Sequence, residues 1–350
     1  MTTLPDTTAP DGPYLFYRGD ALMAEWVYTD TQQVRKMVFA PSYFDRLPRF
    51  QSFRPEMVDP KREFKQVETV HFDGVSKVAA LSDIHGQYAT ARRLLEINGV
   101  IDGNQHWAFG DGHLVVVGDI FDRGDEVTEL LWLVHNLQLE AEEAGGRVHF
   151  LLGNHETMTL EGDNRYVHKK YRVTSGLTGK FYHELYGPNT YLGRWLRSLP
   201  LAVQINETVY IHGGLSREMV KQVSSLDRLN NLYHRYLIDT EDMYDMLDGN
   251  RQMETMHGRD GPLWYRGYFT RDTFSDRDMD FVLRKIGAER IVVGHTSFTA
   301  INTFYDGRLI AVDSSIKFGS TGELLMMEDG QYFRATLMGE RTPLDLSPTK

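Results

Sequence analysis

The sequence predicts an α/β fold with a layered core and a small antiparallel β unit at the N-terminus. Short runs rich in Val, Ile and Leu alternate with longer segments of helical periodicity, which is typical of a largely buried sheet covered by helices. Asp-Gly pairs at 306–307 and 329–330 are typical of hairpin turns, so the C-terminal strands are expected to be antiparallel. The chain has 350 residues and no Cys, and this length buries a sizeable core without disulfides.

The N-terminal unit is expected over residues 14–40, where two aromatic runs, 14–18 and 26–28, are each followed by a turn signal. Residues 41–68 carry aromatic side chains without a clean period and are expected to form an arm that packs on the main domain. The predicted division is therefore a tail, β unit and arm over residues 1–70, and a single main domain over residues 71–350.

The main domain is expected to begin with strands and helices in alternation. The predicted strands cover residues 77–81, 114–117, 148–152, 209–211, 291–293 and 309–312. The predicted helices cover residues 89–97 and 127–144, and residues 216–280 form a helical and irregular region of unassigned order.

Charge and hydropathy exclude two classes of partner. The formal net charge of -11 argues against a broad nucleic-acid-binding surface. Residues 1–12 lack the basic flank and apolar run of a signal peptide, and no apolar stretch reaches the roughly 20 residues that span a bilayer. The expected protein is cytoplasmic and has neither a nucleic-acid nor a membrane partner, although removal of a leader would make a periplasmic location equally compatible. The sequence does not indicate an oligomeric state.

Polar residues follow each of the strongest predicted strands at the point where the strand ends. Because the carboxyl ends of strands line the ligand crevice in open α/β sheets, these side chains are expected to meet. They are two carboxylates, an amide and three imidazoles: Asp83, His85, Asp119, Asn154, His212 and His295. Each alone is better explained as a turn residue, a helix cap or a structural histidine. Their joint placement at five strand ends, with glycines around each, favours a functional site.

These donors suit hard or borderline divalent metals such as Mn, Fe, Zn or Co. Asp83 and His85, two residues apart on an extended segment, are expected to project to one side and hold one ion. The second ion is expected to bind Asn154, His212 and His295. Asp119 is the natural bridge, because one carboxylate can offer an oxygen to each ion. A metal pair about 3.5–4 Å apart holds a bridging hydroxide that attacks phosphorus in line with the leaving oxygen.

Phosphoester hydrolysis also requires groups that bind the phosphoryl oxygens and an acid that protonates the leaving oxygen, and the same motifs contain candidate residues for both roles. Arg123 and Arg266 can neutralise the phosphoryl oxygens through their planar guanidinium forks, and Asn154 is a further candidate contact of the substrate. His155 can protonate the leaving oxygen, with Asp122 holding its ring in place.

Several motifs together resemble the phosphoprotein phosphatase family of calcineurin-like metallophosphoesterases. They are Asp83-Ile-His85-Gly, Gly118-Asp-Ile-Phe-Asp-Arg-Gly124, Gly153-Asn-His-Glu156, His212-Gly-Gly214 and Gly294-His295. Within that family the chain looks most similar to the bacterial Shewanella-like phosphatases, partly through Gly261-Pro-Leu-Trp-Tyr-Arg266. The resemblance covers residues 77–315.

The resemblance implies a layered β-sandwich flanked by helices, the metal assignments above and a catalytic domain over residues 71–350. It also implies that Asp122 and His155 form the acid catalyst, and that Arg123 and Arg266 bind phosphate. Ser82 departs from the Gly that many relatives carry before the first Asp, but it supplies no ligand, so no loss of metal is expected.

Three functions remain open at this point. The leading one is hydrolysis of phosphate monoesters, as a protein phosphatase acting on phosphotyrosine, phosphoserine or phosphothreonine. A dinucleoside polyphosphate hydrolase would use the same centre but requires a basic or aromatic nucleotide pocket, of which the sequence shows no marked sign. An inactive phosphopeptide-binding scaffold is disfavoured because every ligand and the Asp122–His155 pair are present. Arg165 and Tyr166 follow His155 by about three helical turns; a surface helix is favoured for them, and a place at the border of the pocket is the alternative.

Overall fold

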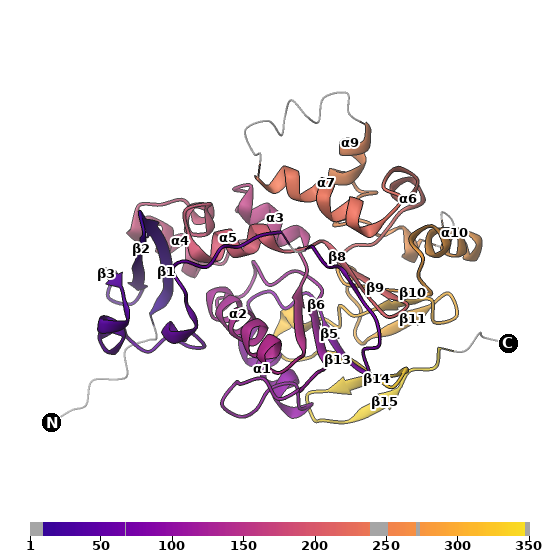
Figure 1. Cartoon of the computed structure of the whole chain (residues 1–350), viewed down its shortest axis with the longest axis horizontal. Helices are drawn as coiled ribbons and strands as arrows, with labels where there is room; N and C mark the ends of the chain where they lie inside the picture. The colour runs from indigo at the N-terminus through magenta and orange to yellow at the C-terminus, as the bar shows by residue number, and fades with distance from the viewer. Residues whose placement is uncertain (1–9, 67, 239–250, 271–273, 347–350) are drawn as a thin grey trace.

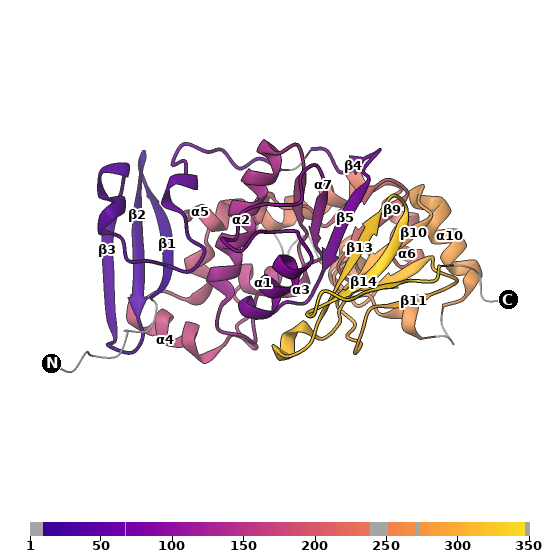
Figure 2. The ribbon, with the colours of Figure 1, turned by 90° about the horizontal axis from the view of Figure 1, so that it is seen from below.

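Three sheets and the helices between them make up the molecule (Figure 1). The structure is a computed structural model that describes residues 10–66, 68–238, 251–270 and 274–346. A three-stranded sheet lies at one end and two six-stranded sheets lie towards the other, with α1, α2 and α5 between them (Figure 2). No helix in these ranges is both long and apolar enough to cross a bilayer.

Two six-stranded sheets form the core of the fold. The first has the order β15 (Arg341–Pro343), β14 (Gln331–Thr336), β13 (Glu323–Glu328), β5 (Lys77–Leu81), β6 (His113–Val116), β7 (Arg147–Phe150). The second has the order β11 (Asn302–Phe304), β12 (Leu309–Ala311), β10 (Arg290–Val293), β9 (Thr208–Ile211), β8 (Ala202–Ile205), β4 (His71–Phe72). Strands β5, β6 and β7 are parallel to one another, as are β9, β10 and β12, so their carboxyl ends fall at common edges.

Alternate residues of the central strands face different layers. Val78 and Ala80 of β5 belong to an apolar cluster shared by both sheets. Ala79 and Leu81 belong to the larger cluster formed with the helices. Burial on both faces explains why these strands read as continuous apolar runs in the sequence. The strands of the predicted buried sheet are thus divided between two stacked sheets, which is the sandwich that the family resemblance implied.

Helices cover the outer faces of the sandwich. The first group comprises α1 (Tyr88–Ile97), α2 (Val127–Glu143), α3 (Asn154–Leu160), α4 (Lys169–Thr178) and α5 (Tyr191–Ser198). The second comprises α6 (Arg217–Gln222), α7 (Leu226–Ile238), α9 (Arg251–His257) and α10 (Asp276–Ile286). Short 3-10 turns connect them: η1 (Pro41–Arg46), η2 (Pro55–Met57), η3 (Tyr182–Tyr186), η4 (Gly267–Phe269) and η5 (Ile316–Phe318). The predicted strands and the first two helices are confirmed to within two residues at each end.

Both predicted Asp-Gly turns are confirmed. The pair at 329–330 is the two-residue loop between β13 and β14, and the pair at 306–307 lies between β11 and β12. Asp329 and Gly330 both have positive φ, 47° and 79°, which a type I′ hairpin turn requires at its two central positions.

The N-terminal unit is an antiparallel sheet of β1 (Asp11–Arg18), β2 (Ala21–Tyr28) and β3 (Gln33–Phe39), as predicted. In the arm that follows, Phe53 packs on Trp132 of α2, with ring centroids 4.7 Å apart. The predicted boundary at residue 70 stays a prediction, and most of the predicted tail, residues 1–9, lies outside the described ranges.

A buried polar cluster joins the N-terminal unit to the helices. The carboxylate of Asp11 accepts hydrogen bonds from Tyr14 Oη (2.9 Å) and Thr174 Oγ1 (2.6 Å). Lys170 Nζ lies 3.5 Å from Asp11 and 2.9 Å from Glu129. Burial raises the pKa of Glu129 to about 7, although Lys170 opposes that shift.

Glu129→Gln is expected to change how stability depends on pH. Because the pKa of Glu129 in the folded protein lies above its ordinary value of about 4.5, the contribution of Glu129 to the free energy of unfolding falls as the pH rises from about 4.5 to 7. The variant lacks this dependence and should be more stable than the wild type at pH 8 by about 1–3 kcal/mol. Urea unfolding at pH 5 and pH 8 measures the difference. Glu142→Gln, at an exposed pair with Arg147, is the control, and equal pH slopes for wild type and Glu129→Gln would contradict the assignment.

Candidate active site

The polar residues that follow the central strands meet at the carboxyl edges of the two sheets. Asp83 and His85 follow β5, Asp119 follows β6, and Asn154 begins α3 just after β7. From the second sheet come His212 after β9 and His295 after β10. All six side chains are buried. The structure therefore brings together every metal ligand that the sequence predicted.

The backbone at this edge is unusual, because six non-glycine residues adopt the left-handed conformation. Their φ values are 53° (Asp83), 48° (His85), 62° (Asp119), 70° (Asp122), 66° (Arg123) and 63° (His295). The expectation that Asp83 and His85 lie on an extended segment is wrong. Tight left-handed turns aim both side chains at the site, a conformation that non-glycine residues adopt mainly where surrounding structure imposes it.

Asp119 lies at the centre of the imidazoles. Its Oδ2 is 3.3 Å from His212 Nε2, 3.7 Å from His85 Nε2 and 3.9 Å from His155 Nε2. Burial alone would raise the pKa of Asp119, but the surrounding histidines hold it well below its usual range. The carboxylate is therefore ionised and faces three ring nitrogens.

The ring orientations fit a metal site. Nδ1 of His85 lies 2.7 Å from the carbonyl oxygen of Phe121, and Nδ1 of His212 lies 2.7 Å from that of Val117. A hydrogen bond from Nδ1 to a carbonyl turns Nε2 towards the site, and in the neutral ring its lone pair is then free for a metal ion, which is how histidine ligands are held. Nε2 of His295 is buried and has no hydrogen-bond partner among the described residues.

The electrostatics of the site favour added positive charge. Burial, together with the neighbouring carboxylates of Asp313 and Asp119, raises the pKa of Asp83 well above its usual range. The side chains form two groups, and within each group the donor atoms lie within 4.8 Å of one another. One group is His85, Asp119 and His155, and the other is Asp119, His212 and His295. Asn154 Oδ1 lies 3.0 Å from His212 Nε2. Oxygen and imidazole donors without thiolates fit divalent metal ions, and Asp119 belongs to both groups.

His155 and Asp122 form a buried pair beside this centre. Nδ1 of His155 lies 2.6 Å from Oδ2 of Asp122. Burial raises the pKa of Asp122, whereas the contact with His155 lowers it. Nε2 of His155 is turned the other way, 3.5 Å from Arg123 Nη2. The carboxylate thus orients the ring so that Nε2 faces the site.

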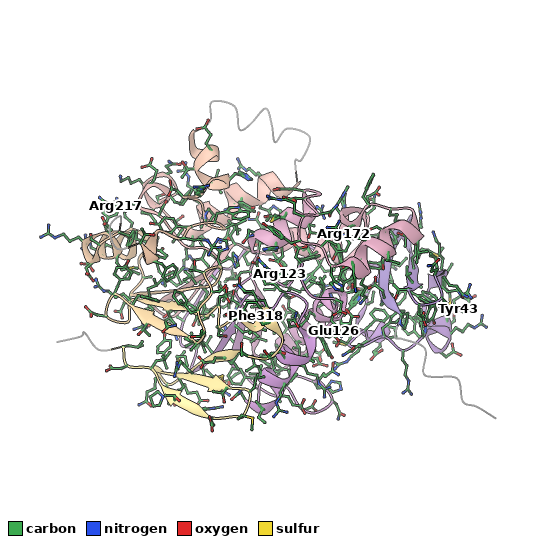
Figure 3. The ribbon with its side chains drawn as sticks, turned by 180° about the vertical axis from the view of Figure 1, so that it is seen from behind. Tyr43, Arg123, Glu126, Arg172, Arg217 and Phe318 are labelled. Atoms are coloured by element: carbon green, nitrogen blue, oxygen red, sulfur yellow. The ribbon has the colours of Figure 1, made fainter. Side chains whose placement is uncertain are left out.

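Arg123 and Tyr166 lie together at the rim, and Figure 3 shows Arg123 near the middle of the molecule. The guanidinium carbon of Arg123 lies 5.5 Å from the ring centre of Tyr166, and the His155 ring lies 5.3 Å from it. The backbone N–H of Arg123 donates to the carbonyl oxygen of Tyr166 (3.0 Å). The prediction of a surface helix here is wrong. The short helix α3 ends at Leu160, and the turns that follow bring Tyr166 back to the site.

Arg266 lies next to His295. Its Nη1 donates to the carbonyl oxygen of His295 (2.8 Å) and to Thr296 Oγ1 (2.9 Å). The side chain is exposed, so its remaining N–H groups are accessible to a ligand.

Glu156 has a positioning role that the sequence did not reveal. Its buried carboxylate accepts hydrogen bonds from the backbone N–H groups of Asp119 (2.8 Å), Ile120 (2.7 Å) and Gly153 (2.7 Å). These bonds tie the turn that carries Asp119 to the start of α3. The Glu after Asn154 and His155 in the motif was the available signal, because an acid at the third position of a helix caps its N-terminus.

Comparisons with known proteins agree with this geometry. Residues 76–297 match the family model of the calcineurin-like phosphoesterases. The crystal structure of a cold-active protein-tyrosine phosphatase from a psychrophilic Shewanella species is similar at a TM-score of 0.85 and 38% identity, covering 96% of this chain and 100% of that chain. Shewanella-like protein phosphatase 1 of Plasmodium berghei is 28% identical over 256 residues, which are 70% of this chain and 68% of that protein. Shewanella-like protein phosphatase 2 of Arabidopsis thaliana is 39% identical over 112 residues, only 28% of that protein.

The matched region contains all the predicted site residues, from Asp83 to His295. It also contains both sheets' central strands, whose ends bring those residues together. The chain therefore belongs to the calcineurin-like phosphoesterase family and is a metal-dependent phosphoester hydrolase.

Proposed function

We propose that this enzyme hydrolyses phosphate monoesters with two metal ions and acts on phosphorylated proteins, with phosphotyrosine as its preferred side chain. The observation that carries the proposal is the buried Asp122–His155 pair, whose Nε2 lies beside both Asp119 and Arg123. A proton donor next to a phosphoryl-binding cation is what hydrolysis of an ester with a poor leaving group requires. The Shewanella structure named as a protein-tyrosine phosphatase supports the choice of substrate.

In this proposal Asp83 and His85 hold one ion, with Asp119 shared between the two. The second ion is held by Asn154, His212 and His295. Such ions lower the pKa of water from 15.7 toward about 7 and offset charge on the phosphoryl oxygens. Manganese, iron, zinc and cobalt all suit this set of donors.

The other residues act on the substrate. Arg123, beside His155, and Arg266, beside His295, bind the phosphoryl oxygens, and the Asn154 amide is a further contact. His155 donates the proton on Nε2 to the leaving oxygen. Asp122 keeps the ring oriented and stabilises its charged form before the transfer.

Tyr166 is the proposed contact of the leaving group. The leaving oxygen must lie next to Nε2 of His155, and the Tyr166 ring lies beside that imidazole with 46% of its surface exposed. An aromatic leaving group can pack against this ring, whereas the short side chain of phosphoserine offers little to it.

Tyr166→Ala is expected to lower kcat/KM for a phosphotyrosine peptide about two- to tenfold more than for a phosphoserine peptide. The quantity to compare is the ratio of kcat/KM for the phosphotyrosine peptide to that for the phosphoserine peptide. Loss of the Tyr166 ring also removes a contact of Arg123, but that effect lowers kcat/KM for both peptides alike and does not change the ratio. Tyr166→Phe keeps the ring and should preserve the ratio. Equal losses on both peptides in Tyr166→Ala would contradict the leaving-group contact.

The proposed function is tested by removing metals, restoring them one at a time, and measuring steady-state hydrolysis of four substrates. These are p-nitrophenyl phosphate, a phosphotyrosine peptide, a phosphoserine peptide and diadenosine tetraphosphate. Metal-dependent turnover of the peptides, with phosphotyrosine fastest, supports the proposal. Turnover confined to the dinucleotide would assign a dinucleoside polyphosphate hydrolase instead. A fully metallated protein inert towards all four would indicate a binding scaffold.

A further inference from the structure

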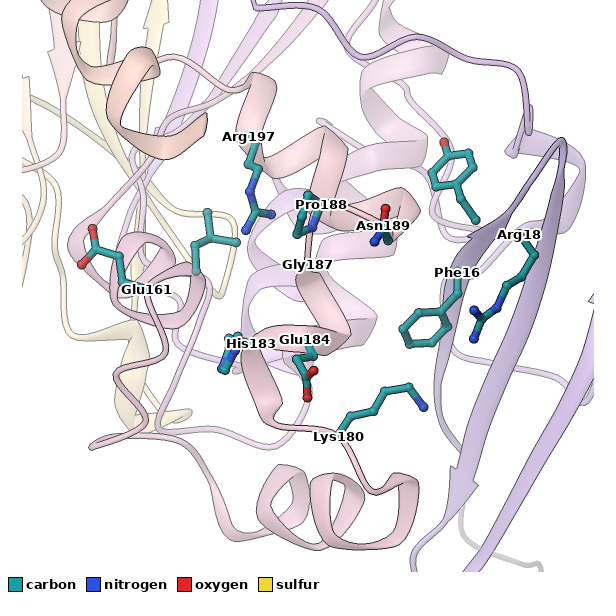
Figure 4. A pocket seen from close by; sticks show the side chains of 12 residues that line it. Phe16, Arg18, Glu161, Lys180, His183, Glu184, Gly187, Pro188, Asn189 and Arg197 are labelled. Carbon is teal, nitrogen blue, oxygen red and sulfur yellow. The ribbon is translucent and has the colours of Figure 1, made fainter. Parts of the chain in front are cut away.

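A cavity of about 630 Å³ lies between the N-terminal sheet and the helices of the catalytic part (Figure 4). It is bordered by β1, by the last residues of α3 and α5, and by the chain between Lys180 and Asn189. Its lining contains none of the proposed metal ligands, and the proposed mechanism uses none of its residues.

Arg197 gives the cavity a cation that is paired with no carboxylate in the described part of the chain. Its Nη1 donates to the carbonyl oxygens of Tyr186 (2.7 Å) and Gly193 (3.0 Å), which fix the guanidinium in place. Burial lowers the pKa of Arg197 to about 10, and within the described ranges no acidic residue forms an ion pair with it. A half-buried guanidinium without a counter-ion is unfavourable, and Nε and Nη2 remain available as donors.

Two of the other charged side chains at the cavity, Lys180 and Glu184, are already engaged. Lys180 Nζ binds both carboxylate oxygens of Glu25 at 2.9 and 3.0 Å. Glu184 accepts the backbone N–H of Phe181 (2.6 Å). Burial raises the pKa of Glu161 to about 7, so this carboxyl is partly protonated near neutral pH and repels an anion less than a full charge would.

The chain segment that supplies most of the lining is basic although the protein is acidic. Residues 161–200 carry seven Arg or Lys and three Asp or Glu, in a chain with a formal net charge of -11. Arg18, exposed on β1, adds a further cation at the lining. At the lining itself Arg18, Lys180 and Arg197 are basic, Glu161 and Glu184 are acidic, and Lys180 is paired with Glu25. Arg18 and Arg197 are therefore the cations that attract an anionic group to the cavity.

The geometry points to a second ligand site, in which Arg197 binds the carboxylate, sulfonate or phosphate group of an organic anion. The apolar part of the ligand packs against Phe16, Leu160 and Pro188, which also line the cavity. In Figure 4 the Arg197 side chain is directed towards Gly187 and His183, into the space that these segments surround.

Two sources can deliver such a group. One is a free small molecule. The other is an acidic side chain of the bound phosphoprotein, because α3 carries His155 near its first residue and Leu160 at its last. Five residues of helix span roughly 8 Å, a distance that two to three residues of extended peptide can bridge.

The test uses p-toluenesulfonate, an aromatic anion that phosphatases cannot hydrolyse, with the metal-loaded full chain and calorimetric or NMR titration. Saturable binding is expected, and Arg197→Gln should weaken it about tenfold or more, because a hydrogen bond to a charged group is lost. The affinity of Arg197→Lys for p-toluenesulfonate should lie between those of the wild type and Arg197→Gln. Arg172→Gln, which removes an exposed cation from α4 outside the cavity, is the matched control and should bind as the wild type does.

A second variant guards against loss of structure in Arg197→Gln. Asn189 is exposed at the cavity, and only its backbone carbonyl is used, to accept the N–H of Tyr17 (2.8 Å). Asn189→Trp should therefore fill the cavity, leave Arg197 intact and weaken binding as well. Absence of saturable binding by the wild type, or unchanged binding by both variants, overturns the proposal. Because the readout is binding, this result is independent of whether the proposed phosphatase activity holds.

Kinetics then assign the source of the anion. If p-toluenesulfonate raises KM for a phosphotyrosine peptide with acidic flanks but not for p-nitrophenyl phosphate, the site takes a side chain of the substrate. If both KM values stay unchanged while the probe binds, the site takes a free anion. An equal rise for both substrates in wild type and Arg197→Gln would place the probe in the active site and contradict the proposal.

Discussion

Asp119→Asn is expected to lower the metal content of the purified protein and to abolish turnover of p-nitrophenyl phosphate. Residues that merely support a ligand cost about 10–100-fold in metal affinity when replaced, so loss of the shared ligand should exceed about 100-fold. The fold should survive, because an Asn oxygen can still accept the N–H of His155, which now donates to Asp119 Oδ1 at 3.0 Å. Elemental analysis after gel filtration and steady-state kinetics measure the two effects together.

Asp111→Asn is the control for that experiment. Asp111 is an exposed carboxylate paired with Lys77 at 3.1 Å, and its removal should leave both the metal content and the turnover unchanged. Unchanged metal content and activity in Asp119→Asn would refute the assignment of Asp119 as the ligand shared by two ions.

His155→Ala is expected to retain its metals and to lose activity in a way that depends on the leaving group. Removal of a general acid costs about 10²–10⁴-fold. The loss should be largest for alkyl phosphates, whose leaving oxygens need the proton, and smallest for p-nitrophenyl phosphate. The measurement is kcat/KM over a series of aryl and alkyl phosphates whose leaving groups differ in pKa.

The control for His155→Ala is His106→Ala, which removes an exposed histidine paired with Glu140. It should leave the whole series unchanged. Losses of equal size across the series in His155→Ala would contradict an acid role. A parallel loss of metal would instead make His155 a ligand, since its Nε2 lies 3.9 Å from Asp119 Oδ2.

Much of the fold could be predicted from the sequence because its central strands are buried on both faces. The runs at 78–81 and 291–293 are apolar at consecutive positions and are followed by polar residues, so both the strands and their carboxyl ends could be located. That the strands divide between two sheets could not be derived from the runs themselves, because a buried strand looks the same in either sheet. The resemblance to a family supplied that part.

The candidate site was predictable wherever a functional side chain directly follows a strand. Asp119 and His295 are such cases, since the strand direction alone places them at the crevice. Tyr166 was missed because its position depends on where α3 ends. Gly162, with φ of 86°, allows the chain to turn back immediately after that helix, and periodicity does not report such a turn. The capping role of Glu156 could be inferred from its place at the third position of α3, but its bonds to the N–H groups of Asp119 and Ile120 depend on how β6 and α3 lie together, which the sequence does not show.

The left-handed turns at the candidate active site set stability and activity against each other. Each such non-glycine residue costs on the order of 1–3 kcal/mol, and six of them occur together. Glycine in place of Asp83 or His85 would relieve the backbone strain but would also remove a proposed metal ligand, so the gain in stability is expected to come with a loss of activity. Attempts to make this enzyme more heat-resistant should therefore leave these turns alone and begin at distant sites such as Glu129. Variants selected only for thermal stability are expected to lose catalytic activity.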